Sequence, residues 1–141
     1  MTKIKYSEVE VGFELPKFSQ NFKRENLNAY AKASGDFNKI HLDEEFAKSV
    51  GLPNIIAHGM LTMGIAGKVV TNWLADPNAI KSFSVKFSSP VVVPDDGVGI
   101  DVEFTGRIGE KMDDNKVKIE LEARCLGTKV LGRSLVIAQL A

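Results

Sequence analysis

Two residues that could move protons lie in the segment Ser34–His41, which reads SGDFNKIH. Asp36 and His41 are five residues apart in a stretch without helical or strand periodicity, so a loop can turn both side chains toward one spot. A carboxylate and an imidazole that share one water or one substrate hydroxyl form a general acid–base pair, and the ordinary pKa of histidine, about 6.5, suits this work. Because Asp-x-Asn is also common in turns, spacing alone leaves open that Asp36 and Asn38 only shape the loop.

The segment Ile55–Met60, which reads IIAHGM, is the second candidate and leads into a long apolar stretch. The first N–H groups of a helix have no partner inside it and carry the positive end of its dipole. At Gly59 a substrate carbonyl, such as that of a thioester, could approach these donors, and an enolate forming there needs such an oxyanion site. The alternative is that Gly59 permits tight packing and that His58 caps the helix; for His58 itself a structural role is favoured over that of a second base.

Three helices are predicted around these segments. Residues 23–33 carry apolar side chains at helical spacing, and Gly35 can end that helix in the left-handed conformation. Residues 43–49 form a short helix that Asp43 can cap. Residues 58–75 place apolar groups around nearly the whole circumference, which indicates a long, buried helix.

Three glycines interrupt the third predicted helix, and each lowers its intrinsic helix propensity. We expect another backbone or a ligand to come close where they occur, because only glycine lacks a Cβ. The three positions are Gly59, Gly64 and Gly67.

The second half of the chain alternates apolar and polar residues with the period of a β-strand. One strand is expected in the first half, at 17–22, and four long ones in the second half, around 82–88, 100–104, 117–123 and 130–140. Together with one long helix, these strands predict an α+β fold in which an antiparallel sheet wraps the helix, and a partner could cover the helix on its other side.

The composition excludes several classes of protein. The 141 residues suit one domain, residues 1–141, and 18 Lys and Arg balance 18 Asp and Glu, so nucleic acid and anionic membrane surfaces are not expected partners. One cysteine and two histidines cannot make an intrachain disulfide or a closed Cys/His zinc site. Neither a signal peptide nor a membrane span is recognisable, which predicts a cytoplasmic location.

Taken together, these segments resemble the MaoC-like, (R)-specific hydratase/dehydratase family of hotdog-fold proteins. The family pattern is an aromatic residue, then Gly-Asp-x-Asn-Pro-hydrophobic-His, then a small residue, and this chain has Tyr30, the segment 35–41 and Ala47 at these positions. The family's later Ala/Val-His-Gly-Met matches residues 57–60. Two positions depart from the family: Lys39 replaces the usual proline, and Gly67 stands where some hydratases carry a serine that contacts the site.

The resemblance implies a single hotdog domain that carries out the reversible dehydration of (3R)-3-hydroxyacyl thioesters to trans-2-enoyl thioesters. It implies that Asp36 and His41 are catalytic, that Asn38 supports the loop or a water, and that the Gly59 N–H polarises the thioester carbonyl. No metal, nucleotide or flavin cofactor is expected. The thioester carrier is coenzyme A or an acyl carrier protein, and the site is expected at a subunit interface.

Within the family, residues 57–65 and 131–134 resemble the catalytic subunit of the heterodimeric (3R)-hydroxyacyl-ACP dehydratase of mycolic-acid fatty acid elongation. That resemblance predicts a hydro-lyase subunit of fatty acid elongation, paired with another hotdog subunit. A homodimeric (R)-specific enoyl-CoA hydratase is an alternative with the same chemistry. A non-catalytic acyl-binding hotdog subunit is a second alternative, which the intact set Asp36, Asn38 and His41 argues against.

Overall fold

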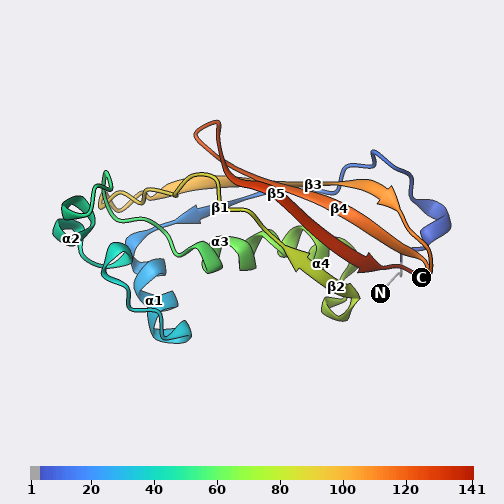
Figure 1. Cartoon of the computed structure of the whole chain (residues 1–141), viewed down its shortest axis with the longest axis horizontal. Coiled ribbons are helices and arrows are strands. Elements are labelled where there is room, and N and C mark those ends of the chain that lie inside the picture. The colour runs from blue at the N-terminus through green and yellow to red at the C-terminus, as the bar shows by residue number, and fades with distance from the viewer. Residues whose placement is uncertain (1–3) are drawn as a thin grey trace.

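The computed structural model describes residues 4–141, and one antiparallel five-stranded sheet dominates it. The order of strands across the sheet is β1-β3-β4-β5-β2, so the short strands β1 and β2 form the two edges (Figure 1). The strands are β1 (Phe18–Phe22), β2 (Ile80–Ser84), β3 (Ile100–Lys111), β4 (Lys116–Cys125) and β5 (Thr128–Gln139).

Two successive helices run beneath this sheet, and two more lie at one end of it (Figure 1). The sheet curves over α3 and α4, which is the hotdog arrangement expected from the sequence and confirms the α+β class. The helices are α1 (Arg24–Ser34), α2 (Glu44–Ser49), α3 (Gly59–Ala66) and α4 (Lys68–Leu74), with 3-10 turns η1 (Tyr6–Glu8), η2 (Lys39–His41) and η3 (Pro77–Ala79).

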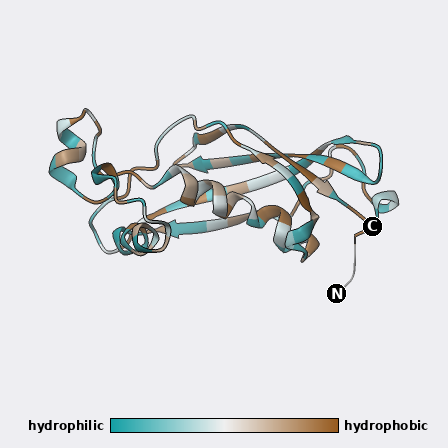
Figure 2. Cartoon of the chain, turned by 60° about the horizontal axis from the view of Figure 1, so that its bottom comes forward, coloured by the Kyte–Doolittle hydropathy of each residue, from teal (hydrophilic) through white to brown (hydrophobic). Residues whose placement is uncertain are grey.

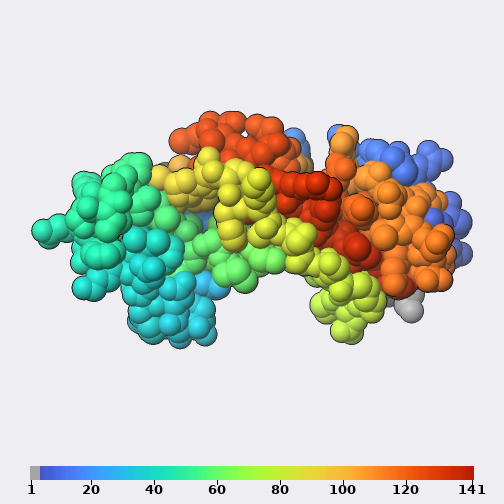
Figure 3. All heavy atoms as spheres, viewed as in Figure 1, coloured from blue at the N-terminus to red at the C-terminus, as the bar shows by residue number. Residues whose placement is uncertain are grey.

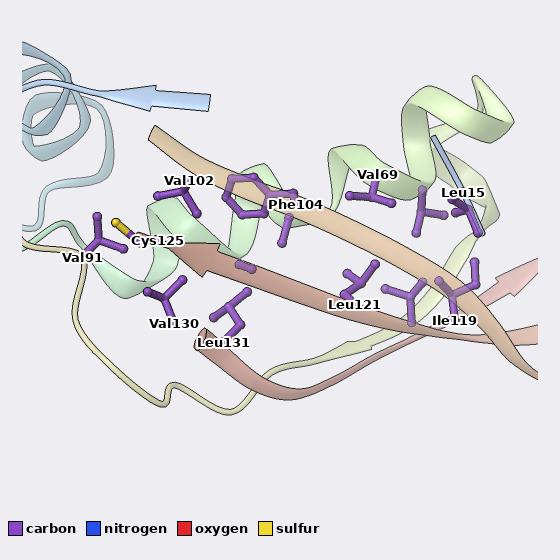
Figure 4. Close-up of a cluster of buried hydrophobic side chains, with 14 of the residues drawn as sticks. Leu15, Val69, Val91, Val102, Phe104, Ile119, Leu121, Cys125, Val130 and Leu131 are labelled. Atoms are coloured by element: carbon purple, nitrogen blue, oxygen red, sulfur yellow. The ribbon is translucent and has the colours of Figure 1, made fainter. Parts of the chain in front are cut away.

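The core lies between the three long strands and the helix pair. Side chains along β3, β4 and β5 alternate between buried and more exposed, as the period of two predicted. Figure 4 shows Phe104, Leu121 and Val69 in the space between strands and helix. Burying one such side chain fully stabilises the fold by about 1.5–3 kcal/mol. The buried residues of these strands include Val102, Phe104, Ile108, Val117, Ile119, Leu121, Ala123, Leu131, Val136 and Ala138.

Gly106 allows α4 to lie close to the sheet. A Cβ built on this glycine of β3 would lie 2.9 Å from Cγ1 of Val69 and 3.0 Å from Cδ2 of Leu121. Both distances are shorter than an ordinary carbon–carbon contact of about 3.5–4.0 Å. The glycine therefore provides the room that Val69 occupies.

The long helix predicted over 58–75 is observed as α3 and α4, which Gly67 separates. Two of the three glycines have a close neighbour in the chain, but it is an aromatic side chain rather than the expected backbone or ligand. A Cβ on Gly67 would lie 3.2 Å from the Phe83 ring, and one on Gly59 would lie 3.0 Å from the Phe87 ring. At Gly64 no atom of the described chain lies within 4 Å of the Cβ position.

The prediction of a helix buried on nearly all sides is also wrong for the chain taken alone. Thr62, Ala66 and Val70 are buried, whereas Met60 is 58% exposed. The reason is that the sheet covers one side of the helix only, so that part of α3 (green) reaches the surface in Figure 3. Figure 2 shows apolar and near-neutral residues over much of α3 and α4.

The predicted strands are observed with different lengths. The first strand of the second half ends at Ser84 rather than near residue 88, and Phe87 makes only an isolated bridge with Leu131. The next strand continues well past residue 104, to Lys111. Among residues 4–141, no helix is both long and apolar enough to cross a bilayer.

Candidate active site

The loop that follows α1 is shaped by short local hydrogen bonds. Gly35 takes the left-handed conformation, with φ of 81°, and ends α1 as the sequence predicted. Ser34 Oγ donates to the Tyr30 carbonyl oxygen at 2.7 Å and accepts from the Asp36 N–H at 3.1 Å. These contacts reverse the chain immediately before Asp36.

Two further turns fix the rest of this loop. The Asp36 Oδ1 accepts from the Asn38 N–H at 3.1 Å, and the Asn38 Oδ1 accepts from the Ile40 N–H at 3.2 Å. Asn38 thereby caps the 3-10 turn η2, at the end of which His41 lies. Of the two roles expected for Asn38, support of the loop is the one that this geometry provides.

His41 is held in one tautomer. Its side chain is buried, and its Nδ1 lies 2.7 Å from the carbonyl oxygen of Ile56. Because a carbonyl oxygen can only accept, Nδ1 carries the hydrogen, and Nε2 of the neutral ring is an unprotonated acceptor. The Ile56 N–H donates to the Ile40 carbonyl oxygen at 3.2 Å, so backbone contacts brace the same position. His41 is therefore oriented with one nitrogen free to accept a proton.

His58 packs against this loop from the start of α3. It is 1% exposed, and its ring stacks on the His41 ring with centroids 3.9 Å apart. Its Nε2 donates to the Asp36 carbonyl oxygen at 3.1 Å, and the Tyr30 and His58 rings meet edge to face with their centroids 4.7 Å apart. His58 occupies the N-cap position of α3, as the alternative expected, but its side chain makes no capping hydrogen bond and bonds to the loop instead.

The charge state of His58 follows from its surroundings. Burial lowers its pKa below 6.5, and the nearby His41 lowers it further, while the Asp36 carbonyl and carboxylate act in the opposite direction. Its Nδ1 is buried without a hydrogen-bond partner in the described chain. A proton on Nδ1 would have no acceptor, so the ring is neutral near pH 7.

Asp36, His41 and His58 each place one oxygen or nitrogen within 4.8 Å of the other two. A shared metal ion does not fit this cluster. The lone pair of an imidazole lies in the ring plane, and the two rings are stacked with an angle of 25° between their planes. An ion in the plane of one ring would therefore lie above the face of the other.

A cavity of about 390 Å³ opens beside His41. His41 and Gly59 line it, whereas Asp36 and Asn38 are exposed at the surface and do not. Ligand pockets range from about 300 to 1,000 Å³, so the volume suits a small acyl group. The remaining lining residues are mostly apolar: Ile40, Ile56, Ala57, Thr62, Phe87, Ser88, Ser89, Pro90, Val91 and Val130.

Backbone hydrogen bonds join the floor of this cavity to its wall. The Ala57 N–H donates to the Val91 carbonyl at 2.8 Å, and the Val93 N–H donates to the Ile55 carbonyl at 2.9 Å. Ile56, which lies between them, is the residue that holds His41. The cavity wall and the imidazole therefore share one rigid stretch of chain.

Gly59 lines the same cavity. It is the first residue of α3, and its N–H has no acceptor among residues 4–141. The Phe87 ring covers this glycine, with Cε1 and Cζ 3.0 Å from the position of a Cβ. Tight packing and an available donor are therefore both observed at Gly59.

A larger hollow lies over the outer face of the sheet, lined by acidic and basic side chains in equal number. Several of these charges pair with one another: Arg107 with Glu120 at 2.9 Å, and Lys129 with Glu122 at 3.2 Å. Charged side chains make up most of this lining, whereas small-molecule pockets are lined mainly by apolar and aromatic side chains. The cavity beside His41 is therefore the candidate active site.

Comparison with known proteins agrees with this arrangement. The family model of the MaoC-like domain matches residues 8–124. The chain belongs to the MaoC-like domain family. A solved MaoC-like dehydratase superposes on 99% of this MaoC-like chain with a TM-score of 0.94 and 36% identity, over 43% of its own length.

Two further proteins resemble this MaoC-like chain. The (R)-hydratase PhaJ1 of Pseudomonas aeruginosa superposes with a TM-score of 0.82 and 26% identity, covering 99% of this chain and 88% of its own. A mitochondrial 3-hydroxyacyl-[acyl-carrier-protein] dehydratase of Arabidopsis thaliana is 30% identical over 105 residues, which are 74% of this chain and 60% of that protein. Other curated relatives are far longer, and the chain spans 6% and 20% of two of them.

Sequence reasoning identified the loop and Gly59 but missed two features of the site. The contact of the Ile56 carbonyl with His41 could not be read from the sequence, because a residue of any type supplies a backbone carbonyl. Phe87 falls in the strand predicted around 82–88, where it alternates regularly with Phe83 and Val85 as a buried residue would. It is in fact 52% exposed and lines the cavity.

Proposed function

We propose that this chain is a hydro-lyase that reversibly dehydrates (3R)-3-hydroxyacyl thioesters to trans-2-enoyl thioesters in fatty acid metabolism. The observation that carries the proposal is the free Nε2 of His41 at the wall of an apolar cavity, beside the Asp36 carboxylate. The names of the family member and of the (R)-hydratase that superpose on the chain support the same reaction class.

In the hydration direction, a water held between Asp36 and His41 attacks C3 of the enoyl thioester. Its oxygen forms a bond to C3, while the C2–C3 π electrons move toward the thioester carbonyl and give an enolate. The acid–base pair removes one proton from the water and returns one proton to C2, so the protein ends the turnover unchanged. Dehydration is the reverse of these steps.

The Gly59 N–H stabilises the enolate oxygen in this proposal. It is a preorganised donor at the positive end of α3, and its hydrogen bond strengthens as negative charge develops on the carbonyl oxygen. The apolar cavity wall excludes water, which strengthens both interactions. Asn38 contributes by holding the loop between Asp36 and His41.

The test is a pair of nearly isosteric variants, His41→Asn and Asp36→Asn. An asparagine at 41 can still donate to the Ile56 carbonyl but cannot accept a proton, so the fold should persist. Each variant should lower kcat for hydration of trans-2-enoyl-CoA substrates by about 10²–10⁴-fold. Hydration at near wild-type rates by both folded variants would refute the proposal. Binding of acyl thioesters by the wild-type protein without turnover at any chain length would favour the acyl-binding subunit instead.

We further propose that the working protein is a dimer with a second hotdog subunit. The outward side of α3 supports this assembly, since Met60 is 58% exposed and the surface is hollowed between α1 and η3 (Figure 3). Mass measurement of the purified chain and assays with coenzyme A and acyl-carrier-protein substrates test it. Full activity of the chain alone, as a homodimer, favours the (R)-specific enoyl-CoA hydratase; activity only with a second subunit favours the elongation dehydratase.

A further inference from the structure

His58 makes a contact with each part of the loop that carries the acid–base pair. Its Nε2 donates a hydrogen bond to the Asp36 carbonyl oxygen at 3.1 Å. Its ring stacks on the His41 ring with centroids 3.9 Å apart, and the Tyr30 ring of α1 packs against it with centroids 4.7 Å apart. His58 immediately precedes α3, whose first residue, Gly59, lines the cavity. One side chain thus links the carboxylate loop, the imidazole and the helix start.

The hydrogen bond to Asp36 excludes His58 as a proton carrier. Nε2 must keep its hydrogen to donate to a carbonyl oxygen, and the buried Nδ1 is not among the groups that line the cavity. The titratable groups in contact with the ring are Asp36, His41 and Tyr30. A proton on His58 would place a positive charge beside His41, and this charge would oppose the proton transfer to His41 that the reaction requires.

Packing alone does not account for a histidine at this position. A buried polar atom without a partner destabilises a fold by about 1–3 kcal/mol, and Nδ1 of His58 is such an atom. An apolar side chain would avoid that loss but could not donate to Asp36. The geometry therefore favours a role for the Nε2–H donor that an apolar residue could not replace.

We propose that His58 is a positioning residue, which holds the Asp36 carboxylate and the His41 ring in a fixed position relative to each other. The proposal rests on the proposed function, because it concerns the same acid–base pair. His58 acts through two contacts: the donor fixes the Asp36 peptide, and the ring face confines His41 between itself and the Ile56 carbonyl. Misplacement of reacting groups by about 1 Å lowers rates by about 100-fold, and this is the scale expected for loss of His58.

The experiment compares His58→Gln with His58→Asn in the full chain. Both variants remove the ring, but a glutamine amide reaches the position of Nε2 and can donate to Asp36, whereas the shorter asparagine cannot. His58→Asn should lower kcat by about 100-fold and leave KM within threefold of wild type. The kcat of His58→Gln should be at least tenfold higher than that of His58→Asn. Circular dichroism and Tm verify that both are folded.

Two outcomes overturn the proposal: kcat of folded His58→Asn within threefold of wild type, or no recovery by folded His58→Gln. If the asparagine variant does not fold, nitrogen NMR of the wild-type imidazoles decides. His58 should remain neutral and protonated on Nε2 from pH 6 to 8, and a His58 that titrates in this range would overturn the proposal. His41→Asn, assayed in parallel, separates the two failures. It should be inactive if the proposed function holds, whatever His58 does, and it should keep near wild-type activity if the proposed function itself is wrong.

Discussion

The substitution Gly59→Ala tests whether the first N–H of α3 receives the substrate carbonyl. The new Cβ would lie 3.0 Å from Cε1 and Cζ of Phe87. This is about 0.5–1 Å inside an ordinary carbon–carbon contact. Because the Phe87 side chain is 52% exposed, its ring can turn toward solvent, and leaving its preferred rotamer costs about 0.5–1.5 kcal/mol.

The expected change in stability is small, because two effects oppose each other. Alanine is favoured over glycine in a helix by up to about 1 kcal/mol, which offsets the displacement of the ring. A net change within about 1 kcal/mol shifts Tm by at most about 2–4 °C in a chain near this length. The rate should respond differently, since the new methyl group obstructs the approach of the thioester carbonyl to the N–H. Loss of one oxyanion donor lowers kcat by about 10²–10³-fold.

The assay measures kcat for enoyl thioester hydration beside Tm, with Gly64→Ala as the matched control. Gly64 lies on the same helix with nothing within 4 Å of its Cβ position. The control should therefore raise Tm by up to about 2–4 °C, and it should keep kcat within about twofold of wild type when its measured mass matches the wild-type assembly. A Gly59→Ala protein that is folded and turns over at the wild-type rate would refute the oxyanion role.

Two further predictions concern stability. Since burial lowers the pKa of His58 in the folded chain, the unfolded chain binds a proton near pH 6.5 that the folded chain does not. The contribution of His58 to the free energy of unfolding should therefore be constant above about pH 7. As the pH falls below 6.5, this contribution should decrease by up to about 1.4 kcal/mol per pH unit. Urea titrations at pH 5.5 and 7.5 should show a weaker pH dependence for His58→Gln than for wild type. An unchanged slope in the variant would contradict the assignment. Gly106→Ala should lower the free energy of unfolding by about 1–3 kcal/mol, because its Cβ would overlap Val69 and Leu121; a urea midpoint equal to that of wild type would show that α4 can move away from the sheet.

Local rules account for the parts of the structure that the sequence predicted well. The end of α1 at Gly35 depends on one left-handed residue, and the cap of α2 on one Asp43 side chain that accepts the Phe46 N–H. The three long strands follow from a period of two that extends over most of their length. In each case the deciding information lies within a few residues of the feature.

Features that depend on distant segments were not predictable in this way. The exposure of Phe87 depends on where residue 131 lies, since an isolated bridge to Leu131 fixes its backbone outside a regular strand. The contact between His58 and Asp36 joins residues 22 positions apart. The pattern placed Asp36 and His41 in one loop, but only the folded chain shows that His41 is buried and Asp36 exposed.

The bracing of residues 55–57 limits how this pocket can be re-engineered. Ile55 and Ala57 pair with the strand-like segment 91–93, while Ile56 holds both the backbone of residue 40 and the ring of His41. Widening the pocket from this side would shift the imidazole together with the wall, and turnover would decline along with selectivity. Phe87 and Val130 line the same space from other segments of the chain, so acyl-length variants are better sought at those two positions.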